Sequence, residues 1–328
     1  MNYTSNADCS VSKQSSALRT PLIFRIGAEF IASAFAMFTI YMFSSIVTAM
    51  YGVNVLMIAV GTGIAYAAAI GIASKFSGGH VNPAITIASM LTGRTPYISG
   101  ILYIIAQVLG AIAAAGVTVF VLPQTKMVPA HTWFAPVVNG FENASISANQ
   151  LKSVNASFGV ITALVVEIIA VLVIVATAMT YMNDNGSTKC GYSTHMGIAY
   201  AAGAFITYQI TGAGLNPARS TGIAILAQSQ KLSVSPLSQL WVFWIAPVFA
   251  AALVGFVMLI CKLATSSSNN QNPVAADCSN QTSPVLQNTV PVVPEPPVNT
   301  ESSVTPSTTL DSTGNDNVPF NPFNRDDK

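Results

Sequence analysis

The chain has 328 residues, of which 52% are hydrophobic and only 8% are charged, and its formal net charge is +1. Soluble domains have about 25% charged residues, so this composition excludes an ordinary soluble protein. We expect an integral membrane protein whose surroundings are the lipid bilayer, with no nucleic acid among its partners.

Polar segments flank an apolar centre. Residues 1–21 are expected to form a cytoplasmic N-terminal segment, and residues 264–328, rich in Ser, Thr, Asn and Pro, a disordered cytoplasmic tail. The first apolar run is too long for a signal-peptide core, so we expect it to be retained. Six apolar runs of helical length lie between the flanks, at residues 24–49, 55–73, 98–122, 158–181, 196–210 and 240–263. All but the fifth have the roughly 17–25 residues that a bilayer crossing needs.

A repeated tripeptide separates these runs. Each copy follows a glycine-rich stretch and begins a short apolar segment, and the copies are Asn82-Pro83-Ala84 and Asn216-Pro217-Ala218. Asn is a favoured helix N-cap, and Pro suits the first helical position. The segments after them, to about Leu91 and Ala227, span only about half of a 30 Å hydrocarbon core. The predicted fold class is therefore an all-α membrane protein with six transmembrane helices and two re-entrant half-helices.

The two halves of the chain are similar. Glu29 in the first run matches Glu167 in the fourth, and each half holds three crossings and one half-helix. Three crossings per half place the halves in opposite orientations, which is an inverted 3+3 repeat. The half-helix N-termini should then face each other near the midplane, with the amides of Asn82 and Asn216 donating hydrogen bonds into a lumen.

Charge sets the expected orientation. With cytoplasmic termini, Lys and Arg are more frequent in the inner segments than in the outer ones, as the positive-inside rule requires. The long loop at residues 123–157 then lies outside, and it contains two N-glycosylation sequons, at Asn143 and Asn155. All four cysteines fall on or near the cytoplasmic side, so we expect no disulfide and no metal site. We expect the cell membrane, with an internal vesicle membrane as the alternative.

The duplicated tripeptides within GGHVNPA and NPARS, together with the paired glutamates, resemble the aquaporin or major intrinsic protein family over residues 22–263. The resemblance implies a homotetramer with one pore per subunit, and a passive water channel that excludes protons and ions. The sequence has no nucleotide-binding loop, metal-ligand cluster or nucleophile motif, so we expect neither an enzyme nor a cofactor. In this family picture Glu29 and Glu167 anchor the re-entrant loops; the alternative is a proton relay in an active transporter.

The resemblance also assigns pore residues. A ladder of backbone carbonyls is implied at Gly78, Gly79, His80, Val81, Gly212, Ala213, Gly214 and Leu215. The narrow outer filter corresponds to Thr62, Ala204, Ala213 and Arg219. The Arg219 guanidinium would offer donors to a permeating oxygen and oppose cations.

The filter leaves the solute range open. Water-selective members usually have an aromatic residue and a His where this chain has Thr62 and Ala204, so the neck should be wider, unless a one-residue shift places Phe205 there. Ser220 after the second motif and the aromatic residues Phe243 and Trp244 match the water-type pattern instead. We predict water as the main solute, with a broader channel for glycerol, urea, ammonia or hydrogen peroxide as the alternative. A secondary transporter and a structural membrane protein are less favoured.

Overall fold

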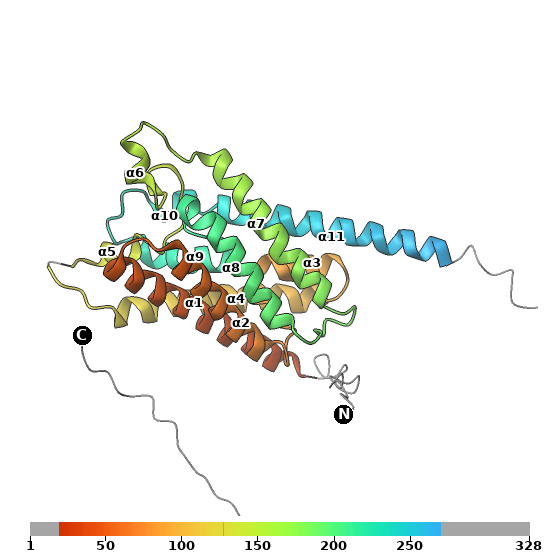
Figure 1. Cartoon of the computed structure of the whole chain (residues 1–328). Helices are drawn as coiled ribbons and strands as arrows, with labels where there is room; N and C mark the ends of the chain where they lie inside the picture. Colours follow the sequence, from red (N-terminus) through yellow and green to blue (C-terminus); the bar gives the residue numbers. More distant parts are fainter. Residues whose placement is uncertain (1–19, 127, 270–328) are drawn as a thin grey trace, which may run out of the picture. The chain divides into compact units, whose positions relative to one another are not determined.

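The computed structural model describes residues 20–126 and 128–269, which form a bundle of helices joined by loops (Figure 1). Most of the N-terminal segment at 1–21 and most of the tail at 264–328 lie outside the described residues. Cys9 and Cys278 lie there too, whereas Cys190 and Cys261 are free and exposed.

Six long helices make up the bundle. They are α1 (Leu22–Tyr51), α2 (Val55–Ala73), α4 (Tyr97–Val121), α7 (Val160–Tyr181), α8 (Tyr192–Thr211) and α11 (Val242–Asn269). Among the described residues, five helices are long and apolar enough to cross a membrane. The remaining long helix, α8, has 20 residues but a more polar sequence. The predicted all-helical membrane fold is confirmed.

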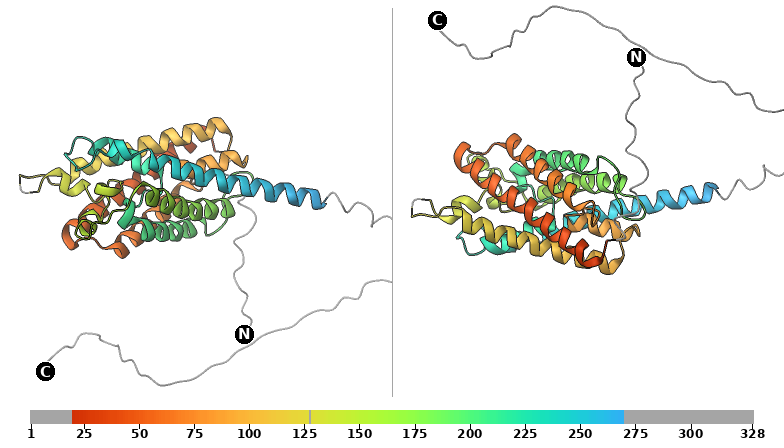
Figure 2. Two further views of the ribbon diagram at one scale, coloured as in Figure 1. Left: turned by 90° about the horizontal axis from the view of Figure 1, so that it is seen from above. Right: turned by 90° about the horizontal axis from the view of Figure 1, so that it is seen from below.

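Two short helices lie between the long ones at the predicted places. They are α3 (Pro83–Leu91) with 9 residues and α9 (Pro217–Ala227) with 11 residues. The connecting segments α5 (Ala130–Phe134), η3 (Glu142–Ala144), α6 (Ala148–Lys152) and α10 (Pro236–Gln239) gather at one end of the bundle. The start of α1 and the end of α11 lie at the other end, where α11 projects beyond its neighbours (Figure 2).

Two helix boundaries differ from the prediction by four residues or more. Helix α8 begins at Tyr192 rather than Met196, because a left-handed Gly191 starts it and its first turn is polar. The apolar run therefore underestimates its length. Helix α11 continues to Asn269, so residues 264–269 are helical, in contrast to the expectation of a disordered tail from residue 264.

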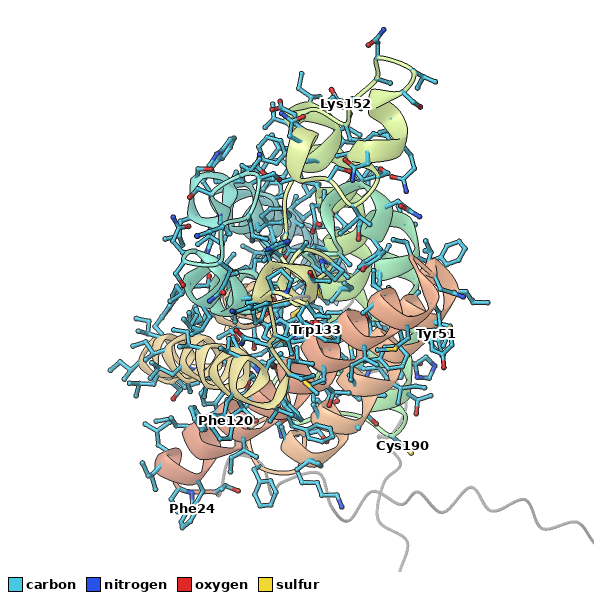
Figure 3. All side chains as sticks on the ribbon, turned by 90° about the vertical axis from the view of Figure 1, so that its left-hand side faces the viewer. Phe24, Tyr51, Phe120, Trp133, Lys152 and Cys190 are labelled. Atoms are coloured by element: carbon cyan, nitrogen blue, oxygen red, sulfur yellow. The ribbon has the colours of Figure 1, made fainter. Side chains whose placement is uncertain are left out.

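Small residues bring the helices close together. Helix α1 packs on α4, and α2 packs on α8. A Cβ atom added at Gly63 of α2 would lie 2.5 Å from the carbonyl oxygen of Gly197 in α8, so only glycine permits this approach. Large apolar side chains point outward instead: Figure 3 shows Phe24 and Phe120 on the surface, and Phe120 is 90% exposed. An apolar exterior around a bundle with buried polar groups suits a lipid environment.

Candidate functional site

Both half-helices begin with the asparagine cap that the tripeptides predict. The Asn82 side-chain oxygen accepts the N–H of Ala84 at 2.9 Å, and the Asn216 oxygen accepts the N–H of Ala218 at 2.9 Å. Proline follows each cap within the first turn. The N-termini of α3 and α9 therefore share the same asparagine cap and proline.

A buried glutamate from a neighbouring long helix contacts the loop before each half-helix. Glu29 of α1 accepts the N–H of His80 at 2.9 Å and that of Val81 at 2.7 Å. Glu167 of α7 accepts the N–H of Gly214 at 2.8 Å and that of Leu215 at 2.7 Å. A carboxylate with two backbone donors is a strong, charge-assisted contact, and it occurs in both halves.

The loops themselves are backbone-strained at matching positions. Positive φ angles occur at 92° for Gly78, 62° for Gly79 and 53° for Val81 in the first loop. The second loop has 74° at Gly212 and positive φ angles also at Ala213 and Leu215. A β-branched residue such as Val81 is rare in this region, so the loop needs outside support. In each loop one strained residue, Val81 or Leu215, donates its N–H to a buried glutamate.

The two asparagine amides reach across to the opposite half of the chain. Asn82 Nδ2 donates to the carbonyl of Leu215 at 3.0 Å, and Asn216 Nδ2 donates to the carbonyl of Val81 at 2.8 Å. The half-helix N-termini therefore meet at one place, between the two loops. The carbonyls of Val81 and Leu215, expected in the ladder, accept these bonds.

The second hydrogen of each amide does not follow the sequence-based expectation. Asn82 Nδ2 also donates to the Tyr200 hydroxyl at 2.8 Å, and Asn216 Nδ2 donates to the Tyr66 hydroxyl at 3.0 Å. The expectation that these groups point into an open lumen is therefore wrong for this conformation. Sequence reasoning missed both tyrosines because they lie inside apolar helices. Their spacing was a usable signal, since each is four residues, about one helical turn, from a filter position.

The four residues predicted for the filter all lie inside the bundle. Thr62 on α2, Ala204 on α8, Ala213 in the second loop and Arg219 on α9 are buried. Phe205, the alternative for the fifth crossing, is 56% exposed on the outer side of α8. Of the two residues, Ala204 faces the inside of the bundle and Phe205 faces away from it, while the role of Ala204 in a filter stays a prediction.

Arg219 is held by neutral partners. Its Nη1 donates to Asn139 Oδ1, and its Nη2 donates to the carbonyl of Gly212 at 3.0 Å. Asn139 Nδ2 donates to the same carbonyl at 2.9 Å, while Ser220 donates to Asn139 Oδ1 at 2.8 Å. The guanidinium is thus fixed by an amide and a carbonyl rather than by a carboxylate. Asn139, in the loop between α5 and η3, was not singled out in the sequence.

The predicted glycosylation sequons lie in the same connection, between α4 and α7. Asn143, on η3, and Asn155, after α6, are both exposed. In the first sequon Ser145 is buried and donates to the carbonyl of Gln209 at 3.0 Å. Modification of either asparagine stays a prediction; in the second sequon the serine, Ser157, is exposed as well.

The chain is similar in sequence to known proteins of one family. The family model of the major intrinsic protein matches residues 17–258. The lens fiber major intrinsic protein of Bos taurus is 32% identical over 238 residues, which cover 72% of this chain and 80% of that protein. Aquaporin TIP2-3 of Arabidopsis thaliana is 31% identical over 202 residues, covering 61% of this chain and 69% of that protein.

A solved structure shares the fold. It is the X-ray structure of the aquaglyceroporin from Plasmodium falciparum, with a TM-score of 0.57 and 19% identity. The match covers 74% of this chain and 98% of that one. Members of the matched family are channels rather than enzymes. With its paired capped half-helices and a family match over most of its length, this chain belongs to the major intrinsic protein family.

Proposed function

We propose that the chain is a passive water channel that excludes protons and ions. The observation that supports this most is the meeting of α3 and α9, where Asn82 and Asn216 each bond to a carbonyl of the other loop. Each helix N-terminus contributes about half a positive charge, so this point opposes cations and protons. A neutral solute that accepts hydrogen bonds suits it.

The outer neck of this pore is formed by Thr62, Ala204, Ala213 and Arg219. Three of these side chains are small, and the guanidinium of Arg219 is fixed by Asn139 and by the carbonyl of Gly212. A fixed positive charge beside small residues opposes cations while leaving room for solutes larger than water. The small residues favour the second candidate, a broader channel for neutral solutes such as glycerol and urea.

The two loops supply the lining below the neck. In this proposal the carbonyls of residues 78–81 and 212–215 accept hydrogen bonds from permeating molecules, and Glu29 and Glu167 anchor the strained backbone that presents them. The symmetric bonding of both carboxylates supports an anchoring role over a proton relay, because each already accepts two backbone N–H groups.

The assembly and location are also proposals. Apolar side chains cover the outer faces of the long helices, which suits contact with lipid and with other copies of the chain. A homotetramer in the cell membrane, with both termini cytoplasmic, is the arrangement we propose, with an internal vesicle membrane as the alternative.

Stopped-flow light scattering on proteoliposomes tests the channel function. We expect osmotic water permeability above that of empty liposomes, with no proton current under a pH gradient. A permeability that saturates with solute or follows an ion gradient would instead indicate a transporter. The control is an equal amount of heat-unfolded protein in the same lipid.

Solute range is tested by the variant Ala204→His. An imidazole in the neck reduces its width, so glycerol and urea permeability should fall several-fold while water permeability changes less. Phe205→His, at the neighbouring outward position, is the matched control and should leave both permeabilities unchanged. Glycerol permeability that is already absent in the natural chain would show that small filter residues do not widen this pore.

A further inference from the structure

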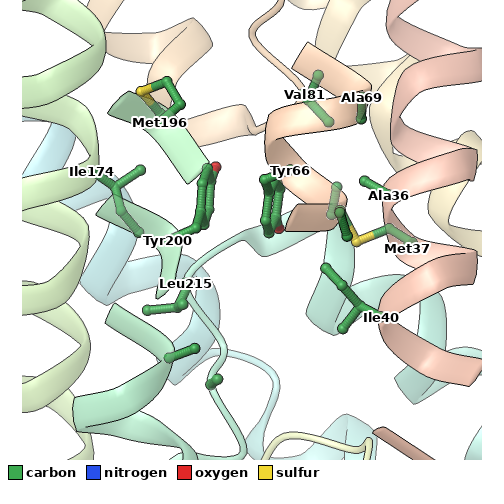
Figure 4. Close-up of a cluster of buried hydrophobic side chains, with 14 of the residues drawn as sticks. Ala36, Met37, Ile40, Tyr66, Ala69, Val81, Ile174, Met196, Tyr200 and Leu215 are labelled. Carbon is green, nitrogen blue, oxygen red and sulfur yellow. The ribbon is translucent and has the colours of Figure 1, made fainter. Parts of the chain in front are cut away.

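Two tyrosines from opposite halves of the chain stack at the meeting point of the half-helices. Tyr66 of α2 and Tyr200 of α8 have ring centroids 3.4 Å apart and ring planes 5° from parallel, and Figure 4 shows the two rings face to face. Both residues are fully buried. The close packing of Gly63 on Gly197 brings their helices near enough for this contact.

The tyrosine hydroxyls occupy the donors that a permeating molecule would use. A side-chain amide has only two N–H hydrogens. For Asn82 these are directed to Tyr200 and to the carbonyl of Leu215, and for Asn216 to Tyr66 and to the carbonyl of Val81. Neither asparagine therefore has a side-chain N–H left to donate to a water oxygen.

Burial agrees with the hydrogen bonding. Asn82, Asn216 and both tyrosines are 0% exposed, so a water molecule does not reach any of them in this conformation. The passage is closed at the level where the two half-helices meet. The stacked rings of Tyr66 and Tyr200 lie at this level, bonded to the two asparagine amides.

We propose that Tyr66 and Tyr200 form a gate. It opens when the two rings separate, and the asparagine amides then donate their hydrogen bonds to the permeating solute instead of to the tyrosine hydroxyls. The gate rests on the proposed channel function. Water competes directly for the bonds that close it, because a water oxygen accepts from an amide as a hydroxyl does. The barrier is modest, since one ring stack and two neutral hydrogen bonds hold the closed state.

The surroundings allow the rings to move. Met196 lies beside Tyr200, one turn earlier on α8 (Figure 4). Methionine has three rotatable bonds and adapts its shape, so it gives way to a moving ring more easily than a branched side chain would. Thr62 and Ala204 of the proposed filter each lie four residues, about one helical turn, from a tyrosine of the gate.

The gate is tested with two double variants in proteoliposomes. Tyr66→Val with Tyr200→Val removes both rings, and water permeability should rise about tenfold or more, as expected when a minor open state becomes dominant. Tyr66→Phe with Tyr200→Phe keeps the rings and removes only the hydroxyls, so its permeability should rise less. Tyr103→Val, at a buried tyrosine of α4 that lies outside the stack and whose hydroxyl has no hydrogen-bond partner among the described residues, is the control for cavity formation and should match the natural chain.

The outcomes separate the gate from the channel function. If the natural chain conducts water well and the valine variant is no faster, the gate is overturned and the channel stands. If only the ring-removed variant conducts, both proposals are supported. If none of the folded proteins conducts above empty liposomes, both are overturned. Should the double valine variant fail to fold, the single variants Tyr66→Val and Tyr200→Val provide the same comparison.

Discussion

Replacing Glu167 with Ala is expected to cause a large loss of stability. The carboxylate accepts the N–H groups of Gly214 and Leu215 and the hydroxyl of Thr211, all buried. Each buried donor left without a partner costs about 1–3 kcal/mol, so the loss should be at least about 3 kcal/mol. The apparent Tm of the detergent-solubilised protein should fall by roughly 6–12 °C.

Two further variants locate the cause of that loss. Glu167→Gln keeps one accepting oxygen, so its Tm should lie between those of the natural chain and Glu167→Ala. Glu142→Ala, which removes an exposed carboxylate in η3, should leave the Tm unchanged. A Glu167→Ala protein as stable as the natural chain would show that the second loop keeps its strained backbone without the glutamate.

Replacing Gly63 with Ala is expected to separate α2 from α8. The added methyl group would lie 2.5 Å from the Gly197 carbonyl oxygen and 2.8 Å from the Ala201 side chain. A backbone oxygen cannot rotate away, so the helices must shift, at a cost of about 1–3 kcal/mol. The measurement is again thermal unfolding, with water permeability as a second readout, because α2 and α8 hold the tyrosine pair.

A matched control distinguishes this contact from the general effect of glycine in a helix. Gly116 of α4 has open space around it, with nothing within 4 Å of an added Cβ. Gly116→Ala should therefore leave stability unchanged or raise it by about 0.5–1 kcal/mol, because alanine is the better helix residue. Opposite signs for the two substitutions would confirm the steric contact, and equal signs would contradict it.

The features that follow from local rules were predictable from the sequence. Asn-Pro at the start of a short apolar run predicts a capped half-helix, and α3 and α9 begin where that rule places them. Helix α2 spans the predicted residues 55–73. The fifth crossing was underestimated because apolarity marks only the lipid-exposed part of a helix, whereas α8 begins with a polar turn.

The features that depend on contacts between distant segments were not predictable. Tyr66 and Tyr200 are 134 positions apart in the sequence, and nothing in either helix indicates that their rings will stack. Asn139 lies 80 positions before Arg219 in an irregular loop, so its role in fixing the guanidinium appears only in three dimensions. The paired glutamates, in contrast, were predictable from the internal repeat. Comparing the two halves of the sequence shows that the position is duplicated, even when its contacts are unknown.

The reciprocal bonding of Asn82 and Asn216 has a consequence for biogenesis. The Asn82 side-chain amide donates a hydrogen bond to the carbonyl of Leu215, which lies 133 positions later in the chain. During synthesis the first half therefore enters the bilayer with a polar loop whose partner has not yet been made. Unpaired polar groups are costly in hydrocarbon, so this intermediate must retain water or a helper protein around its loop until the second half inserts. A ribosome that stalls between the halves would leave a product prone to degradation, and separately expressed halves should be stable only when made together.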